Sequence, residues 1–417
     1  MSNALLPPEM MEVLQALRPV FHAYSWESFL YLITGLLLGQ AQPGIVRASL
    51  VAPGRYNWRR LHDLLRRNAW SGTGLMIALT QMVLSALYPD GFPAYLFWVI
   101  DSTYLEKMYA RAIEGVLIHH RPHPKAGQNR ALKGHGLMLV AHLYQQSAHH
   151  FKAFLLGGLL YVKQESFGQL GQQLFATLPV PAKVHNIALM DRGLTGLKLA
   201  RTLSKQNIYC LGRVKGNARF FLQAPPETYK GRGRPPIYGD KFRADSLPKT
   251  VMQKTQMDVP LDGELVPAVV YRGTFRRKGF PDPIDLIRVE VKKLSPWLLM
   301  LTDLSLPTDQ AVFAYAGRSQ IEVAINQAKG LGLDTYRGRR LKGVQRWPMI
   351  MGVVHCLLQL IAVGGLKLPL PAQNWPWYRK ENTVGSIQRR FIQWMLRRLF
   401  SNLSRQEQNS KKIAYIA

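Results

Sequence analysis

Four polar residues of different chemistry recur at helical spacing in AYAGRSQIEVAINQAKGLGLDTYRGRR, residues 314–340. They are Tyr315, Arg318, Glu322 and Lys329, separated by three, four and seven residues. In an α-helix these spacings return to one face, so the segment predicts an amphipathic helix with a narrow polar stripe. A solvated helix usually scatters its charges over a broad face instead. The stripe is therefore a candidate functional face.

Two of the scarce acidic residues sit where apolar runs end, and these runs predict buried strands. Asp101 follows YLFWVI, and Asp191 follows HNIALM. In open α/β sheets, ligands bind at the carboxyl ends of strands, although a lone Asp at such a place is more often a turn or helix cap. Together with Glu322, the two aspartates make three carboxylates that would repel one another and need cations to stay ionised.

Three carboxylates are suited to divalent metal ions. Mg²⁺ prefers oxygen ligands and typically takes one or two carboxylates together with phosphate oxygens. Two such ions, about 3.5–4 Å apart, can activate the attacking oxygen and stabilise the leaving oxygen in phosphodiester cleavage. The acids therefore predict metal-dependent chemistry on a phosphodiester.

The stripe resembles a known family signature. It matches the Y-(2)-R-(3)-E-(6)-K pattern of DDE transposases of the insertion-sequence-4 superfamily, and with the following LGLDTYRGR it resembles the insertion-sequence-701 branch. VIDST and LMDRGLTG resemble the motifs around that family's first and second aspartates, and GRGRPPIYGDKF resembles a basic stretch after the second. One departure is the small pair Ala316-Gly317, where relatives are often bulkier, aromatic or basic.

The resemblance implies a fold, a reaction and roles for these residues. It implies a ribonuclease H-like core in which Asp101, Asp191 and Glu322 are catalytic and bind Mg²⁺, with Mn²⁺ as a substitute. Tyr315, Arg318 and Lys329 would hold DNA phosphates. The implied function is a cut-and-paste DNA transposase that acts as a homodimer on transposon ends and target DNA. The alternatives are a domesticated DNA-binding protein and a structure-specific nuclease of the same fold.

The charge balance favours a nucleic-acid partner. The chain of 417 residues has 54 Lys and Arg against 25 Asp and Glu, a net charge of +29. Such an excess is typical of proteins that lie beside a polyanion, and we favour nucleic acid over a ribosomal-type or membrane-surface protein. Two cysteines exclude a disulfide framework and a four-cysteine zinc site. The start of the chain resembles no secretory signal, so a cytoplasmic, nucleoid-associated location without membrane contact is expected.

The predicted fold class is α/β. Three strands are followed by helix, strand, helix and strand, and this alternation implies a mixed sheet with helices packed on it. Four parts are expected: a helical DNA-binding domain (1–92), the ribonuclease H-like core (93–214 and 296–345), a β-rich insertion (215–295) and a helical C-terminal region (346–417). The apolar stretch 348–366 is interpreted as a buried core helix rather than a membrane span, because it carries His355 and Gln359.

Further DNA contacts are expected from two basic segments. Arg59 and Arg60 lie on a predicted helix that follows a short helix, as in a helix-turn-helix, although an ordinary helical bundle with a solvated basic face is the alternative. Arg232 and Arg234 belong to GRGRPP, which resembles a minor-groove AT-hook; a basic loop that contacts phosphates is favoured. The histidines between residues 119 and 150 are expected in solvated or DNA-facing loops rather than at a metal.

Overall fold

The computed structural model divides the chain into two compact units. It describes residues 6–39, 44–51, 57–108, 111–120, 127, 129–163, 165–224, 236–261, 263–372 and 382–398. One unit comprises Met1–Pro89, Tyr109–Val116 and Ile325–Ala417, and we call it the helical unit. The other comprises Asp90–Met108 and Leu117–Ala324, and we call it the sheet unit. The predicted division of the chain into four parts stays a prediction.

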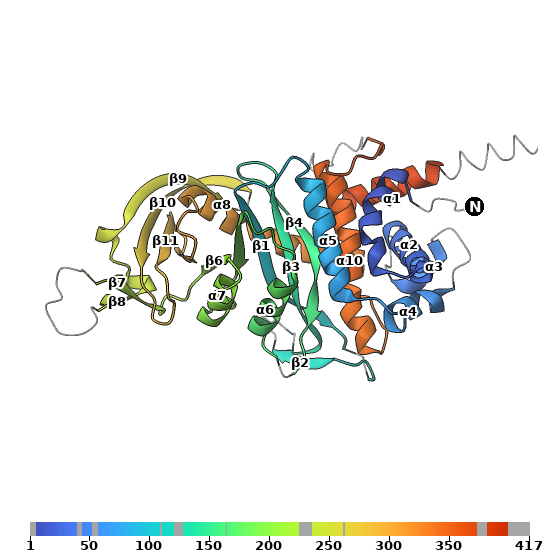
Figure 1. Cartoon of the computed structure of the whole chain (residues 1–417), viewed down its shortest axis with the longest axis horizontal. Coiled ribbons are helices and arrows are strands. Elements are labelled where there is room, and N and C mark those ends of the chain that lie inside the picture. The colour runs from blue at the N-terminus through green and yellow to red at the C-terminus, as the bar shows by residue number, and fades with distance from the viewer. Residues whose placement is uncertain are drawn as a thin grey trace, which may run out of the picture. The chain divides into compact units, whose positions relative to one another are not determined.

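The described part of the sheet unit is organised around a ten-stranded mixed sheet (Figure 1). Its strands are β1 (Tyr95–Glu106), β2 (Leu117–His120), β3 (Ala131–Gln145), β4 (Phe151–Leu160), β5 (His185–Met190), β6 (Ile208–Arg213), β9 (Gln253–Leu261), β10 (Glu264–Phe275), β11 (Ile284–Val291) and β12 (Trp297–Leu301). The order is β2-β3-β1-β5-β6-β12-β11-β10-β9, with β4 also paired to β3. Strand β5 is parallel to β1 and β6, whereas the other pairs are antiparallel.

The central strands are continuous apolar runs because helices cover the sheet. Leu96–Ile100 of β1 are all buried, as expected for a strand that is covered on both faces. Helix α6 (Phe167–Thr177) packs against β3 and β4, and α7 (Leu197–Ser204) packs against β6. Ser166 and Gln169 form a capping box at the start of α6, which explains where this helix begins. Helix α8 (Thr308–Gly317) contacts β4, β6 and β9.

Strand β1 is longer than the sequence predicts. We expected it to end at Asp101, but it continues to Glu106. The reason is its antiparallel partner, because residues 101–106 pair with Gly134–Leu139 of β3. The parallel pairing with β5 stops at Ile100, opposite Met190. Asp101 therefore lies one residue beyond the last parallel pair, within the strand rather than at its end.

The segment 215–295 is rich in strands. Strands β7 (Arg219–Gln223) and β8 (Tyr238–Arg243) form a separate two-stranded sheet. Two short 3₁₀ turns, Ala244–Ser246 and Lys249–Val251, follow. Strands β9, β10 and β11 then join the main sheet beyond β12, so that the segment extends the sheet of the core.

The described residues of the helical unit form a bundle around one long helix. Its elements are α1 (Pro8–Leu14), a 3₁₀ helix (Gln15–Val20), α2 (Ala23–Leu38), α3 (Ile45–Val51), α4 (Trp58–Arg66), α5 (Gly72–Leu87), α10 (Leu341–Val363) and a helical segment at 384–398. Helix α10 contacts α2, α4 and α5. A Cβ at Gly35 of α2 would lie 2.3 Å from the Ala48 carbonyl oxygen of α3, so this close crossing requires glycine.

Helix α10 contains the apolar stretch that we interpreted as a core helix. Among the described residues it is the one helix long and apolar enough to cross a membrane, but 89% of its most apolar window is buried inside the protein. One such buried helix is weak support for a membrane span. The prediction of a buried helix is confirmed.

Several histidines lie in strands, where loops were expected. His119 is on β2, and His135 and His142 are on β3; all three are buried. His142 Nδ1 lies 3.1 Å from the Phe97 carbonyl oxygen. The loop prediction is wrong for His119 and His135 because β2 and β3 pair in the sheet. His142 belongs to the apolar run 136–144, for which the sequence predicts a strand, and that strand is β3. His150 follows β3 in an exposed turn.

Acid should destabilise the fold through its buried histidines. Burial lowers the pKa of His142 from 6.5 to about 4, and burial lowers that of His355 on α10 to about 3. The unfolded chain binds these protons near pH 6.5 and the folded chain does not. The contribution of these histidines to the free energy of unfolding is therefore fully present above pH 6.5. It falls on acidification below that pH, by about 1.4 kcal/mol per pH unit for each histidine. In urea unfolding between pH 7.5 and 5, His142→Gln should flatten this slope, whereas the exposed His150→Gln should not; equal slopes would contradict the assignment.

Candidate active site

Asp101 faces the side of the sheet that carries α8. A Cβ at Gly171 of α6 would lie 3.1 Å from Ile100, so the Ile100 side chain points toward α6. Successive strand residues point to opposite faces, which directs Asp101 away from α6. The Ser102 backbone N–H donates to Asp101 Oδ1 at 2.7 Å. The carboxylate is thus oriented by its own strand.

Asp191 immediately follows β5, as predicted. Its carbonyl oxygen accepts hydrogen bonds from the backbone N–H groups of Leu194 and Thr195, both at 3.0 Å, and from Thr195 Oγ1 at 2.8 Å. This tight turn packs on the neighbouring strand β6. A Cβ at Gly212 would lie 2.4 Å from Thr195 Oγ1, so glycine is required for the turn to approach. Asp191 is therefore fixed at the carboxyl edge of the parallel strands.

The polar stripe lies on two helices, where one continuous helix was predicted. Helix α8 ends at Gly317, and α9 (Gln320–Leu331) begins after a two-residue turn. The backbone tightens there: the N–H of Arg318 bonds to the Tyr315 carbonyl, and that of Glu322 to the Ser319 carbonyl. A Cβ at Gly317 would lie 2.7 Å from the Phe151 ring of β4, so this close contact explains the small residue at the break.

Arg272 of β10 fixes the start of α8. Its guanidinium donates to the carbonyl oxygens of Leu304 and Leu306 and to Thr308 Oγ1. It also pairs with the buried Asp285 at 2.5 Å. Strand β10 therefore fixes the loop that precedes α8, the helix that carries the first residue of the polar stripe.

Arg318 stands between two of the predicted catalytic acids. Its Nη1 lies 3.5 Å from Asp101 Oδ2, and its Nη2 lies 3.2 Å from Glu322 Oε1. The Arg318 side chain is 14% exposed and that of Asp101 is 18%, whereas that of Glu322 is 58% exposed. The pair with Glu322 alone would be a weak surface interaction. The contact with Asp101 on β1 turns it into a partly buried bridge between strand and helix.

Electrostatic coupling links Asp191 to the same group. Burial raises the pKa of the Asp101 carboxyl, and the charges of Glu322 and Asp191 raise it further, against the opposing effects of Arg318 and the Ser102 N–H. Burial alone would lower the pKa of Arg318, but Tyr315 and the three acids together raise it above its ordinary value. The structure thus brings the three acids into electrostatic reach of one guanidinium.

Tyr315 is buried, whereas a residue that contacts DNA phosphate should be accessible. It is 9% exposed, and its ring centroid lies 6.0 Å from that of Trp297. Burial raises the pKa of its hydroxyl. Arg213, the last residue of β6, also acts electrostatically on this tyrosine. Arg213 was not among the residues predicted from the sequence, where its signal is a cation at the end of the strand that follows Asp191.

The remaining residues predicted to contact DNA differ in exposure and in their partners. Lys329 lies in the last turn of α9, within the residues assigned to the helical unit. Arg59 is exposed on α4, where its guanidinium lies 5.6 Å from the Trp58 ring centroid. Arg60 is held by Glu27 and Ser28 of α2, at 3.1 Å each. Arg232 and Arg234 lie outside the described residues.

The acids fit a divalent ion in chemistry but are not assembled as a metal site. Where the chain is described, no three His, Cys, Asp or Glu side chains are grouped closely enough to hold a metal ion. Carboxylate oxygens are nevertheless the ligands that Mg²⁺ prefers. The guanidinium of Arg318 occupies one oxygen each of Asp101 and Glu322, where a cation would be needed.

A Ser–His–Asp cluster lies at the other end of β5 and lacks the geometry of a hydrolase triad. His185 Nδ1 faces both Asp303 Oδ2 at 2.7 Å and Ser305 Oγ at 3.4 Å. A nucleophilic serine must instead meet the second ring nitrogen. Ser305 Oγ donates to Asp303 Oδ1 at 2.6 Å, so the cluster fixes the loop between β12 and α8.

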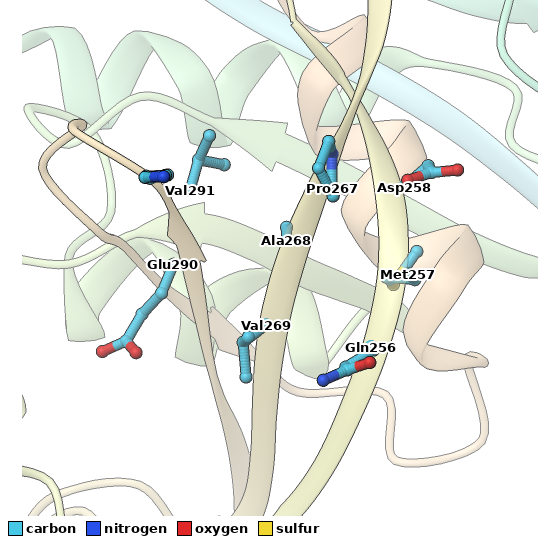
Figure 2. Close-up of a pocket in the computed structure, with 9 residues that line it drawn as sticks. Gln256, Met257, Asp258, Pro267, Ala268, Val269, Glu290 and Val291 are labelled. Atoms are coloured by element: carbon cyan, nitrogen blue, oxygen red, sulfur yellow. The ribbon is translucent and has the colours of Figure 1, made fainter.

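A cavity of about 670 Å³ lies over β9, β10 and β11 (Figure 2), away from the predicted site residues. Its lining includes the acids Asp258 and Glu290 among apolar side chains such as Val269. Glu290 is already paired with Lys249 at 2.8 Å and Arg288 at 2.5 Å. None of the acids and signature residues identified in the sequence lines this cavity.

Comparison with known proteins identifies the family. Residues 111–357, more than half of the 417-residue chain, match the family described as Transposase DDE domain. The matched range contains Asp191 and Glu322, whereas Asp101 precedes it. No curated protein matches the chain. The large mixed sheet with packed helices fits the ribonuclease H-like core of such an enzyme. The chain therefore belongs to the DDE transposase family, whose members are DNA-acting enzymes that use divalent metal ions.

Proposed function

We propose that this transposase moves an insertion sequence of the insertion-sequence-4 superfamily by cut-and-paste transposition. The observation that carries the proposal is the Arg318 bridge, which joins the first predicted aspartate to the predicted glutamate of the signature. Asp191 lies within electrostatic reach of the same group. The enzyme cleaves the element's ends and joins the freed 3′-hydroxyl to target DNA.

In the proposed mechanism Asp101, Asp191 and Glu322 hold the divalent ions, with Mg²⁺ as the metal and Mn²⁺ as a substitute. The bound ions supply activation of the attacking oxygen and stabilisation of the leaving oxygen. Arg318 contacts a phosphate next to the scissile one through its planar donors, and Lys329 contacts another as a point charge. Cleavage and joining are both phosphodiester transfers, so one set of residues serves both steps.

For the buried Tyr315 we propose a different role from the phosphate contact expected from the sequence. Its position beside Trp297 and Arg318 favours support of the Arg318 guanidinium over direct stacking on a DNA base. Arg213 adds positive charge at the same edge. Arg232 and Arg234 of the basic loop are proposed to contact DNA phosphates. The partners are transposon ends and target DNA, bound by a homodimer in the nucleoid of the cytoplasm.

A strand-transfer assay separates this function from its alternatives. The purified chain is incubated with Mg²⁺, a target plasmid and a donor plasmid that carries the gene with its flanking DNA. A transposase releases the element and joins its 3′ ends to the target. A structure-specific nuclease would cut without joining, and a domesticated DNA-binding protein would bind without cutting. Either result would overturn the proposal.

Arg59 and Arg60 should differ in their effects on DNA binding. Arg59→Ala should weaken binding to the element's ends by about 1–3 kcal/mol and shift the sequence preference if the side chain reads a base edge. Arg60→Ala should weaken binding less and lower the melting temperature, because this guanidinium pairs with Glu27 and lies 3.8 Å from the Tyr24 ring centroid. Fluorescence anisotropy on end DNA and scrambled DNA tests both variants. A larger binding loss for Arg60→Ala, at unchanged stability, would contradict the assignment.

A further inference from the structure

We propose that Arg318 is an internal counter-cation that competes with divalent metal for Asp101 and Glu322 until DNA phosphate draws its guanidinium away. This inference rests on the proposed function of the three acids and concerns how the site is regulated. It makes the binding of metal and DNA cooperative. The DNA-free enzyme would then bind metal weakly, and the complex with DNA would bind it well.

The first support is the position of the guanidinium. Arg318 contacts Asp101 Oδ2 on β1 and Glu322 Oε1 on α9, at 3.5 and 3.2 Å. Each contact uses one oxygen of an acid that the proposed mechanism assigns to metal. A divalent ion on those oxygens would lie next to a positive charge, and like charges at such separations in a partly buried site repel strongly. Metal and guanidinium therefore compete for the same oxygens.

The second support is an unsatisfied donor. Nη1 of Arg318 is buried and has no hydrogen-bond partner in the described chain, because its contact with Asp101 is a longer ion pair. A buried donor without an acceptor is unfavourable, so this nitrogen is poised to bond to another oxygen. Phosphate offers paired oxygens in the geometry that a guanidinium matches. Binding of DNA phosphate would therefore favour release of Arg318 from the acids.

The competition has a thermodynamic consequence. If DNA removes the competing cation, it raises the metal affinity by some factor, and metal must raise the DNA affinity by the same factor. The coupling should pass through Arg318, because this residue contacts both acids and is proposed to contact phosphate. Removing the charge should therefore increase metal binding in the absence of DNA and reduce the coupling to the part that the phosphate oxygens supply directly as metal ligands.

The first test measures Mn²⁺ binding to the full-length, DNA-free protein by electron paramagnetic resonance. Arg318→Gln should bind Mn²⁺ at least about ten-fold more tightly than the wild type, a modest coupling for charges in direct contact. Arg318→Lys keeps the charge and should stay close to the wild type. The matched control is Arg288→Gln. Arg288 is similarly shielded and is also paired with a glutamate, Glu290, but it contacts none of the three candidate acids. Unchanged or weaker Mn²⁺ binding by Arg318→Gln would overturn the inference.

The second test adds a DNA duplex that carries the element's terminal sequence. DNA should increase the Mn²⁺ affinity of the wild type and of Arg288→Gln by the same factor, and that of Arg318→Gln by a clearly smaller factor, because only the oxygens of the DNA phosphate still add to metal binding there. An equal increase in all three proteins would overturn the inference while the transposase function stands, provided that the wild type still joins DNA ends. If no protein binds Mn²⁺ and none cuts DNA, the proposed function fails as well. Melting temperatures show whether each variant is folded.

Discussion

Replacing Asp101, Asp191 or Glu322 with its amide should lower DNA cleavage by more than about 100-fold, because even the outer partners of metal ligands contribute about 10–100-fold. The amide keeps the size of each side chain but removes the charge that holds a divalent ion. DNA binding should persist, since phosphate contacts come from lysine and arginine. Cleavage of end DNA is measured in Mg²⁺ and in Mn²⁺, and binding is measured by anisotropy without metal.

The matched control for these variants is Asp258→Asn. Asp258 is an exposed acid on β9, so the substitution removes the same charge in the same unit. Its cleavage rate should stay within about two-fold of the wild type, as for an ordinary surface substitution. A predicted catalytic residue whose amide variant still cuts DNA at that rate has no part in binding the metal.

The strands of the core could be predicted from the sequence because burial on both faces leaves long apolar runs. The apolar run that ends just before Asp191 predicted β5, and the run that begins at about Ile208 predicted β6, in the correct order along the chain. The end of β1 could not be predicted, because residues 101–106 are strand only through pairing with β3. That pairing depends on a segment about 35 residues away along the chain, so the local sequence pattern does not predict it.

The three candidate acids could be chosen from the sequence, but their environment could not. The motif placed Arg318 and Glu322 four residues apart, so their contact follows from helical spacing. The contact of Arg318 with Asp101 joins residues more than 200 positions apart and depends on how α8 packs on the sheet. The break after Gly317 likewise arises from a tertiary contact with Phe151. The buried Tyr315 shows the same limit, since a polar stripe on a helix does not reveal which of its members is covered.

Arg346→Met should destabilise the helical unit by at least about 3 kcal/mol, the cost expected when several buried polar groups lose their partners. The guanidinium of Arg346 on α10 is 5% exposed and donates to the carbonyl oxygens of Leu65 and Asn68 at 2.9 Å, and to that of Trp70. It also lies 4.2 Å from the Trp70 ring centroid. Carbonyls at a helix end have no partner within the helix, so this side chain satisfies the C-terminal end of α4 from another helix.

The charge of Arg346 persists in this buried place. Burial lowers its pKa to about 10, so the guanidinium is protonated at neutral pH and keeps all its donors. Urea unfolding at pH 7 measures the effect, with Arg66→Met on α4 as the control. Arg66 is 39% exposed and pairs with Asp63, so its loss should cost no more than about 1 kcal/mol. Arg346→Lys should fall between the two, because an ammonium reaches fewer of the carbonyls. If Arg346→Met were as stable as the control, the carbonyls of α4 would have another source of hydrogen bonds, and α10 would not be the element that anchors this helix.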